Sequence, residues 1–319
     1  MRSLRVWSSC VALLAATWLH ADELPPQIRV VVPYTAGSSL DARARVIAEA
    51  LGAVLKRRIT VENRPGAGGS LGTQYVARSK ADGSTLLFHN NSYAFNPHIY
   101  AASAYDPIRD FVPVAQAYTS GLVLVAHSSL GVGSVAELVA LARSRSTPLS
   151  YASSGTGGLP HLAMESFKRA AGVDFLHVPY RGDGHALSDV LSGRVPLMMS
   201  GYPIVQSHVR AGTLRALAVT GSGRADIFPD VPTVAQAGYP GFAIDAWVGF
   251  FAPADTPPPV VERLNRAIAT ALASPRVQRQ LAETGARPVV TSSADFAAFM
   301  RREWERYGAM IRDLGLKVE

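Results

Sequence analysis

The sequence contains a single cysteine, Cys10, which lies in an N-terminal segment with the features of a secretory signal peptide. Arg2 and Arg5 precede an apolar run from Val6 to Leu19, and polar residues follow the run. The run is shorter than the ~20 apolar residues that a membrane-spanning helix needs. We therefore predict a signal peptide over residues 1–21 and a mature chain with no thiol or disulfide. A secreted chain of this size without a disulfide indicates the bacterial periplasm.

Basic runs and histidine pairs are also missing. The formal charge of +7 at pH 7 falls to +5 without Arg2 and Arg5. The remaining Lys and Arg stand singly and are not interleaved with aromatic residues, so no nucleic-acid partner is predicted. None of the eight histidines pairs with another histidine or a carboxylate at ligand spacing. We predict no metal site and no cofactor, and we interpret His177, inside an apolar strand, as a core histidine.

Two stretches invite an enzymatic interpretation that they do not sustain. The glycine-rich segment from Arg64 to Gly72 follows a strand, but a dinucleotide fingerprint that starts at Gly66 needs glycine where Leu71 stands. Ser154 reads as the end of a strand and not as a nucleophile on a tight turn. No catalytic residue is predicted, and an α/β enzyme is the less favoured alternative.

Strands and helices alternate along the chain, which predicts an α/β fold with a mostly parallel sheet. Two long apolar strands, within Ala117–Ala126 and Ala243–Ala252, have the length to pass between two domains. They predict a hinge with Gly121 and Gly249 as its mobile points. The segment around Asn96-Pro97 has the composition of a loop and turn.

The stretch from Ile28 to Leu51 contains a β-branched strand, a short loop over Pro33–Ser39 and an amphipathic helix. Leu40, Ala44 and the apolar residues that follow share one helix face, while Arg43 lies on the polar face with other charged residues. A loop that enters a helix N-terminus presents unpaired N–H groups and suits an anion. The alternative is an ordinary βα turn with Ser39 as the N-cap.

The same pattern recurs in SSGTGGLPH and YRGDGHALSD, where a strand again ends in a Gly or Ser loop before a helix. Ligands of open α/β sheets bind at the carboxyl ends of strands. If the three loops face one another across two lobes, they form a cleft that favours a carboxylate without needing a buried Lys or Arg.

These loops carry a resemblance to the periplasmic solute receptors of tripartite tricarboxylate transporters, the Bug or TctC type. The matching stretches include VVPYTAGSSLDARARVIAEAL, VENRPGAGGSLGTQYVARSKADGSTLL, YASSGTGGLPHLAMESFKRAAG and LHVPYRGDGHALSDVLSGRV, and matches extend over nearly all of the mature chain. The resemblance implies a two-lobed periplasmic-binding-protein fold (class II, Venus-flytrap) that closes on a small carboxylate or dicarboxylate. We predict lobe 1 over 22–121 plus 248–319 and lobe 2 over 122–247.

The resemblance also implies which residues hold the ligand. In the first loop they are Tyr34, Thr35, Ala36, Gly37, Ser38 and Ser39 with Asp41; in the second loop Ser154, Gly155, Thr156 and Gly157 with His161; and Asn90, Asn91 and Tyr180 contact the rest of the ligand. The implied partners are the membrane subunits of a tripartite tricarboxylate-type transporter. A periplasmic sensor domain remains an alternative partner, and the expected state is a monomer.

The sequence departs from the family pattern in the first loop, where Ser38-Ser39 replaces the usual glycine after Gly37. The family also commonly has acidic residues where Pro196 and Ser200 stand. A less acidic cleft favours a ligand with more negative charge. The sequence leaves the identity of the carboxylate open.

Overall fold

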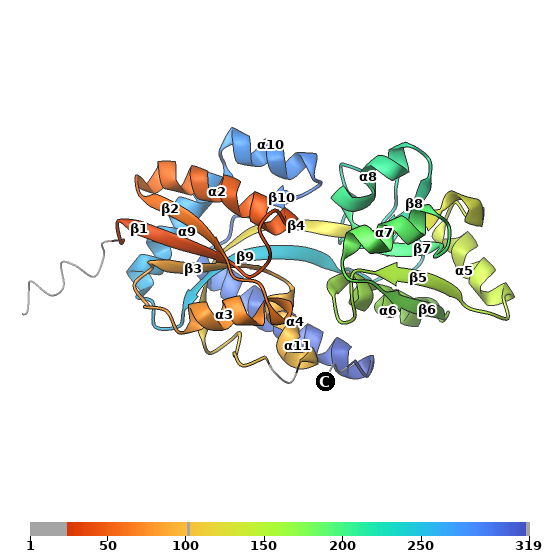
Figure 1. Ribbon diagram of the computed structural model, residues 1–319, viewed down its shortest axis with the longest axis horizontal. Helices are drawn as coiled ribbons and strands as arrows, with labels where there is room; N and C mark the ends of the chain where they lie inside the picture. Colours follow the sequence, from red (N-terminus) through yellow and green to blue (C-terminus); the bar gives the residue numbers. More distant parts are fainter. Residues whose placement is uncertain (1–23, 101–102, 317–319) are drawn as a thin grey trace, which may run out of the picture.

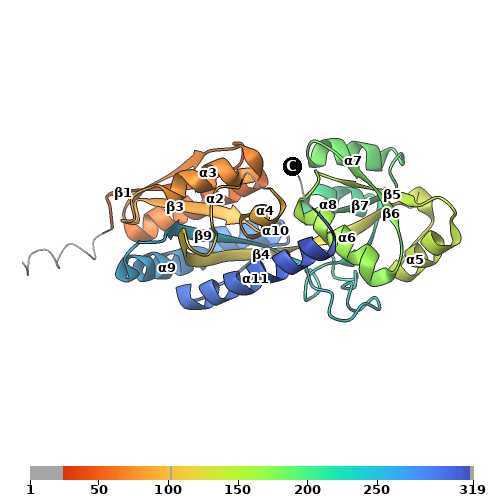
Figure 2. The same ribbon diagram turned by 90° about the horizontal axis from the view of Figure 1, so that it is seen from below.

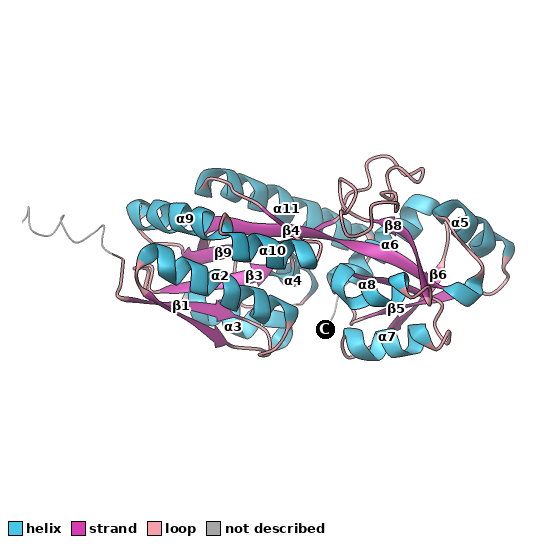
Figure 3. Ribbon diagram, turned by 90° about the horizontal axis from the view of Figure 1, so that it is seen from above, coloured by secondary structure: helices cyan, strands magenta, loops and turns pink. Residues whose placement is uncertain are grey.

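The computed structural model describes residues 24–100 and 103–316, so the predicted signal peptide lies outside the described residues. Two α/β halves, lobe 1 and lobe 2, lie side by side along the longest axis of the molecule (Figure 1). The long strand β4 (Phe111–His127) runs through both (Figure 3). Within the described ranges, no helix is long and apolar enough to cross a membrane.

Lobe 1 is built on a sheet with the strand order β2-β1-β3-β9-β4, in which β1, β2 and β3 are parallel and β9 is antiparallel to both neighbours. Helices α2, α9 and α10 pack on one face, and α3, α4 and α11 pack on the other. The elements are β1 (Gln27–Val32), α2 (Ser39–Leu55), β2 (Arg58–Asn63), α3 (Ser70–Ala77), β3 (Thr85–Asn90), α4 (Ser92–Ile99), β9 (Asp245–Pro253), α9 (Pro258–Leu272), α10 (Pro275–Glu283), β10 (Arg287–Pro288) and α11 (Ser293–Asp313).

Lobe 2 continues the sheet through β4-β7-β5-β6, and β8 pairs with the other edge of β4. Helices α5 and α6 cover one face, and α7 and α8 cover the other. The elements are α5 (Val135–Ser144), β5 (Leu149–Ser153), α6 (Leu159–Ala171), β6 (Phe175–Pro179), α7 (Asp183–Leu191), β7 (Leu197–Gly201), α8 (Tyr202–Arg210) and β8 (Leu214–Val219), with short 3-10 helices η1 (Ala67–Gly69) in lobe 1 and η2 (Ser128–Leu130) here.

Along each strand, successive side chains point to opposite faces of the sheet, and both faces are buried. In β1, Ile28, Val30 and Val32 face the α2 side, and Val31 faces the α4 side. In lobe 2, Leu122 and Leu124 of β4 face α5 and α6, while Val123 and Val125 face α7 and α8. Because side chains alternate along a strand, a run of apolar residues fills two cores at once.

The two lobes meet where β4 changes partner. Its first part pairs with β9, ending at Gly121 opposite Asp245, and its second part pairs with β7 and β8 from Leu122 onward. Residues 245–247, which the sequence assigned to lobe 2, pair in the lobe 1 sheet, so we place the return crossover between Ile244 and Asp245. Both predicted hinge glycines are closely packed: an added Cβ would lie 2.3 Å from Phe296 at Gly249 and 2.0 Å from the Tyr202 hydroxyl at Gly121, so each position has room only for glycine.

Two helices differ from the sequence-based expectation. The segment around Asn96-Pro97, predicted as a loop, forms α4, because Tyr93, Phe95 and Ile99 gain burial in the lobe 1 core. Burial in the core here outweighs the turn preference of Asn and Pro. Helix α8 follows β7 directly and was not predicted.

Helix α11 connects the lobes on the side seen in Figure 2, where it runs along β4 toward α6. Met310 packs against the cores of both lobes, and Arg169 of α6 lies 3.6 Å from Asp313 at the end of α11. Most of the buried side chains of α11 therefore pack in the core of lobe 1, and the C-terminal end of the helix contacts lobe 2.

Candidate functional site

A cavity of about 250 Å³ lies between the lobes, next to the carboxyl ends of β3 and β7; we call it the interlobe cavity. Its apolar wall includes Leu40, Phe95, Leu159, Pro160, Ile204 and Trp247. Its polar members are Ser39, Arg43, Asn90, Asn91, Ser92, Tyr118 and Ser120 from lobe 1 and Ser154, Asp183 and Tyr202 from lobe 2. Of the predicted site residues, Ser39, Asn90, Asn91 and Ser154 line it. The others surround it or lie away from it.

The first loop is held by its own side chains. Ser38, not Ser39, is the N-cap of α2, and its hydroxyl accepts a hydrogen bond from the Asp41 N–H at 3.2 Å. Gly37 adopts φ +81°, which favours glycine, and its N–H donates to Asp41 Oδ2 at 2.9 Å. The Gly37 N–H therefore has an internal acceptor. Thr35 and Ala36 are exposed in the loop and lie outside the cavity wall.

Asp41 fixes this loop. Its carboxylate also accepts hydrogen bonds from Arg45 at 3.1 Å and from the Asn63 amide at 2.9 Å. Burial alone would raise the pKa of Asp41, but the hydrogen bonds from Arg45, Gly37 and Asn63 together lower it below its ordinary value. A carboxylate that is already satisfied by the loop positions the helix start and does not line the cavity.

Asn90 presents a free amide donor to the cavity. Its Oδ1 accepts hydrogen bonds from the Tyr34 hydroxyl at 3.1 Å and from the N–H and hydroxyl of Ser92 at 3.1 Å and 2.8 Å. The Ser92 N–H needs an acceptor, so the amide orientation is fixed and its NH₂ group faces away from these partners. Among the described residues, this NH₂ group has no acceptor. Burial raises the pKa of Tyr34 to about 12, so its hydroxyl remains a donor.

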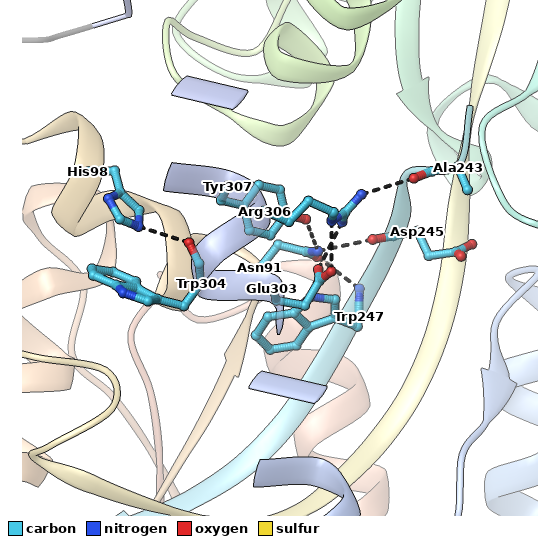
Figure 4. A network of polar contacts seen from close by, with 9 residues as sticks. All are labelled: Asn91, His98, Ala243, Asp245, Trp247, Glu303, Trp304, Arg306 and Tyr307. Carbon is cyan, nitrogen blue, oxygen red and sulfur yellow. Dashed lines mark hydrogen bonds and ion pairs between the residues drawn. The ribbon is translucent and has the colours of Figure 1, made fainter. Parts of the chain in front are cut away.

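Asn91 lines the cavity but uses its amide internally (Figure 4). Its NH₂ group donates to the Asp245 carbonyl at 3.0 Å and to the Tyr307 hydroxyl at 2.7 Å, and its Oδ1 accepts from the Trp247 N–H at 2.8 Å. Two of these hydrogen bonds hold the start of β9, and the third holds α11 at Tyr307, next to the residue that follows β3. The role of Asn91 is to position these elements.

The second loop likewise satisfies much of its own backbone. The Gly155 N–H donates to Ser153 Oγ at 3.3 Å, and the Gly157 N–H donates to His161 Nδ1 at 3.0 Å. The Thr156 carbonyl accepts from the Tyr100 hydroxyl of lobe 1 at 3.3 Å. Ser154 alone of this loop lines the cavity. Tyr180 is not one of the residues that line the cavity, and its hydroxyl donates to Asp189 at 2.7 Å.

His161 caps the second loop as a neutral ring. It is 3% exposed and stacks on His177 with ring centroids 4.0 Å apart. Burial, with a smaller contribution from the positive charge that His177 can carry, lowers the pKa of His161 to about 4. His177 in turn hydrogen-bonds to Ser153 at 2.7 Å, which keeps the stacked pair in register with the loop.

We expect stability to fall on mild acidification because two histidines are held neutral in the fold. Burial lowers the pKa of His89 to about 3, as it lowers that of His161 to about 4, whereas both titrate near 6.5 when unfolded. The unfolded chain thus binds more protons below pH 6.5, and the free energy of unfolding should drop by about 1.4 kcal/mol per pH unit for each histidine down to its folded pKa. Urea unfolding at pH 7 and pH 5 measures this, and His161→Gln should reduce the slope. An unchanged slope in that variant would contradict the assignment.

One stretch has the spacing of a serine-hydrolase nucleophile turn, Gly68-Gly69-Ser70-Leu71-Gly72. Ser70 is buried at the start of α3, and its hydroxyl lies 3.2 Å from that of Ser103. In the described part of the chain, no histidine hydrogen-bonds to Ser70. The described geometry thus assembles no triad around this serine.

Sequence reasoning missed the two charged residues of the cavity, Arg43 and Asp183. Arg43 Nη1 donates to the Tyr118 hydroxyl at 3.3 Å, and the guanidinium carbon lies 5.0 Å from the centre of that ring. Arg43 is one turn after Ser39, so both side chains share the helix face that borders the cavity. The four-residue spacing from Ser39 could have identified Arg43 as a site residue from the sequence. Among residues 24–100 and 103–316, no carboxylate forms an ion pair with Arg43.

The family model for the tripartite tricarboxylate transporter family receptor matches residues 43–316. Protein BugT from Bordetella pertussis is 36% identical over 304 residues, which cover 94% of this chain and 93% of BugT. The match to the family model begins at Arg43, so the first loop lies outside it.

Solved structures agree with these matches. The periplasmic binding protein BugD is 29% identical, covers 92% of this chain and 99% of its own, and superposes with a TM-score of 0.78. Rpa4515 of R. palustris, solved with adipate, is 34% identical, covers 93% of this chain and 100% of its own, and superposes with a TM-score of 0.82. The predicted two-lobed periplasmic-binding-protein fold is confirmed.

Proposed function

Because the chain belongs to the tripartite tricarboxylate transporter family of receptors, we propose that it binds a small carboxylate in the interlobe cavity. It then delivers the ligand to the membrane subunits of a tripartite tricarboxylate-type transporter. The signal peptide predicted for residues 1–21 and the family membership support a periplasmic location. We propose that the protein acts as a monomer and that it binds its ligand without catalysing a reaction.

One observation carries the carboxylate assignment. Three kinds of donor meet on the lobe 1 wall of the cavity: the Arg43 guanidinium, the free NH₂ group of Asn90 and the first turn of α2 at Ser39. The N–H groups in the first turn of a helix have no carbonyl within the helix to bind, and the helix dipole favours an anion there. A carboxylate is the small group that accepts from all three.

Ligand binding closes the lobes because both contribute to the cavity. Ser39, Arg43 and Asn90 belong to lobe 1, and Ser154 and Asp183 belong to lobe 2. A ligand that touches both walls stabilises the closed arrangement by its differential contacts. We place the lobe boundaries at 121/122 and 244/245, where β4 changes partner and β9 begins.

The remaining predicted residues position these groups. Tyr34 orients the Asn90 amide, and Gly37, Ser38 and Asp41 set the start of α2. Gly157 and His161 shape the second loop. A cavity of about 250 Å³ is small beside the ~300–1,000 Å³ of pockets for drug-sized molecules, so the ligand has few heavy atoms.

Binding of small carboxylates should raise the thermal stability of the mature protein. At a ligand concentration of 100 times Kd, the free energy of unfolding should rise by about 2.7 kcal/mol. A thermal-shift screen of mono-, di- and amino carboxylates against matched sugars and amides measures this, and isothermal titration gives the affinity. A shift with sugars or amides but with no carboxylate would refute the proposal.

A further inference from the structure

We propose that Asp183 is a specificity-determining residue, which selects a ligand that carries an ammonium group in addition to its carboxylate. This inference rests on the proposed carboxylate binding and adds the chemical class of the ligand's other end. Asp183 and Arg43 are the two charged side chains of the cavity wall, and they come from opposite lobes.

The fold places Asp183 at the cavity through two neighbouring loops. Gly182 adopts φ +101° just before α7, and its N–H donates to the Ser154 carbonyl at 3.3 Å. Asp183 then opens α7, and its side chain lines the cavity together with Ser154. The second and third loops thus present one carboxylate and one hydroxyl together on the lobe 2 wall.

The negative charge of Asp183 has no cationic partner. Within the two described stretches, no Lys, Arg or His forms an ion pair with it, whereas Asp189 on the same helix pairs with Arg194 at 2.6 Å. Partial burial raises the pKa of Asp183 above its ordinary value, and the Ser154 side chain offsets only part of this effect. Asp183 is half-buried. A carboxylate that is partly removed from water without a cation is destabilised, and a bound ammonium group would supply the missing charge.

The pair of charges argues against a second carboxylate on the ligand. A dicarboxylate anchored at Arg43 would bring its other negative group toward Asp183 in a cavity of about 250 Å³. Like charges at close range disfavour the complex. A ligand with a carboxylate at one end and an ammonium group at the other would place each group opposite a residue of the opposite charge, the carboxylate at Arg43 and the ammonium at Asp183. The ligand class is therefore a small amino acid or ω-amino acid.

Asp183 also occupies a position where an acidic residue stabilises a helix, because it lies in the first turn of α7. A purely structural role predicts a lower melting temperature for Asp183→Asn with the order of ligand affinities unchanged. A role in selection predicts a change in that order. Measured affinities therefore separate the two roles.

The test is isothermal titration of the mature protein with matched ligands that differ at one end. Glycine, β-alanine and 4-aminobutyrate supply an ammonium; acetate, propionate and butyrate lack a second polar group; malonate and succinate supply a second carboxylate. We expect an amino carboxylate to bind about tenfold tighter than its matched mono- and dicarboxylates. Asp183→Asn should abolish that preference, and Asp189→Asn, on the same helix but away from the cavity, should keep it.

The outcomes are distinguishable. Tightest binding by a dicarboxylate, or an unchanged preference in Asp183→Asn, would overturn the role of Asp183 and leave the proposed receptor function intact. A protein that binds no carboxylate of any of the three sets would overturn both. Loss of the amino carboxylate preference in Asp183→Asn alone supports the inference.

Discussion

Replacing Arg43 by methionine is expected to weaken binding of the carboxylate ligand about a hundredfold. Arg43 supplies the positive charge of the cavity wall, and its guanidinium is oriented by the hydrogen bond to the Tyr118 hydroxyl and by the contact with that ring. Removing one partner of a partly buried, hydrogen-bonded charge pair costs about 2–5 kcal/mol of binding free energy, which corresponds to this loss of affinity. Methionine keeps the length and apolar stem of the side chain, so the effect reports the charge. Isothermal titration against the tightest ligand of the screen measures it.

The matched control for this variant is Arg58→Met. Arg58 is exposed at the start of β2, at the opposite end of the lobe 1 strands from the cavity, and its loss changes the net charge of the protein by the same amount. Affinity should be unchanged within about twofold. Equal losses in the two variants would mean that the charge acts at long range and that Arg43 does not contact the ligand.

Replacing Glu303 by leucine should lower the free energy of unfolding by about 3–5 kcal/mol. Glu303 is 6% exposed on α11, and its carboxylate accepts from the indole N–H of Trp247 at 2.8 Å and from two nitrogens of Arg306 at 2.9 Å each (Figure 4). Leucine would leave the indole N–H without an acceptor and the guanidinium without its counter-ion. Urea unfolding followed by tryptophan fluorescence measures the change.

Glu305→Leu is the control, because Glu305 lies two residues further along the same helix and is exposed. Its effect should stay within about 0.5 kcal/mol. A second variant, Glu303→Leu with Arg306→Met, should recover part of the loss because the unpaired charge is removed with its partner. If the two glutamate variants were equally stable, the network in Figure 4 would contribute nothing to the fold.

The network also bears on the movement of the lobes. Arg306 Nη1 donates to the Ala243 carbonyl at 3.0 Å, just before the chain returns to lobe 1. Asn91 holds the Asp245 carbonyl from the other side. The return crossover is therefore held to α11 and to the residue after β3 by hydrogen bonds on both sides.

Much of the fold was accessible from the sequence because the strands carry a physical signal. Apolar runs such as Ile28–Val32 are too short for core helices and end at Pro33, and capping residues such as Ser134 and Ser292 mark helix starts. These signals depend on nearby residues alone. Helix α4 was missed because its stability comes from burial of Tyr93 and Phe95 against distant segments.

The site was predicted at the level of loops and not of atoms. Sequence spacing located the loops at Ser39 and Ser154, which do border the cavity. It did not reveal that the Gly37 N–H has an internal acceptor in Asp41, because that contact depends on backbone conformation. Arg43 and Asp183 were missed since a charged residue near a helix start is ordinarily exposed to solvent. Only the approach of two lobes makes these residues neighbours of one cavity.

The order in which the two lobes can form follows from the strand order of the lobe 1 sheet. Strand β3 lies between β1 and β9, and β9 enters only after the whole of lobe 2 has been synthesised. Lobe 2 is one continuous segment of chain, apart from the end of α11, and has its core before β9 arrives. Until then, β3 presents an open edge, which invites pairing with other chains. The half that contains Arg43 and Asn90 is thus the last to be completed, and the open edge of β3 is the point where the incomplete chain is exposed to pairing with other chains.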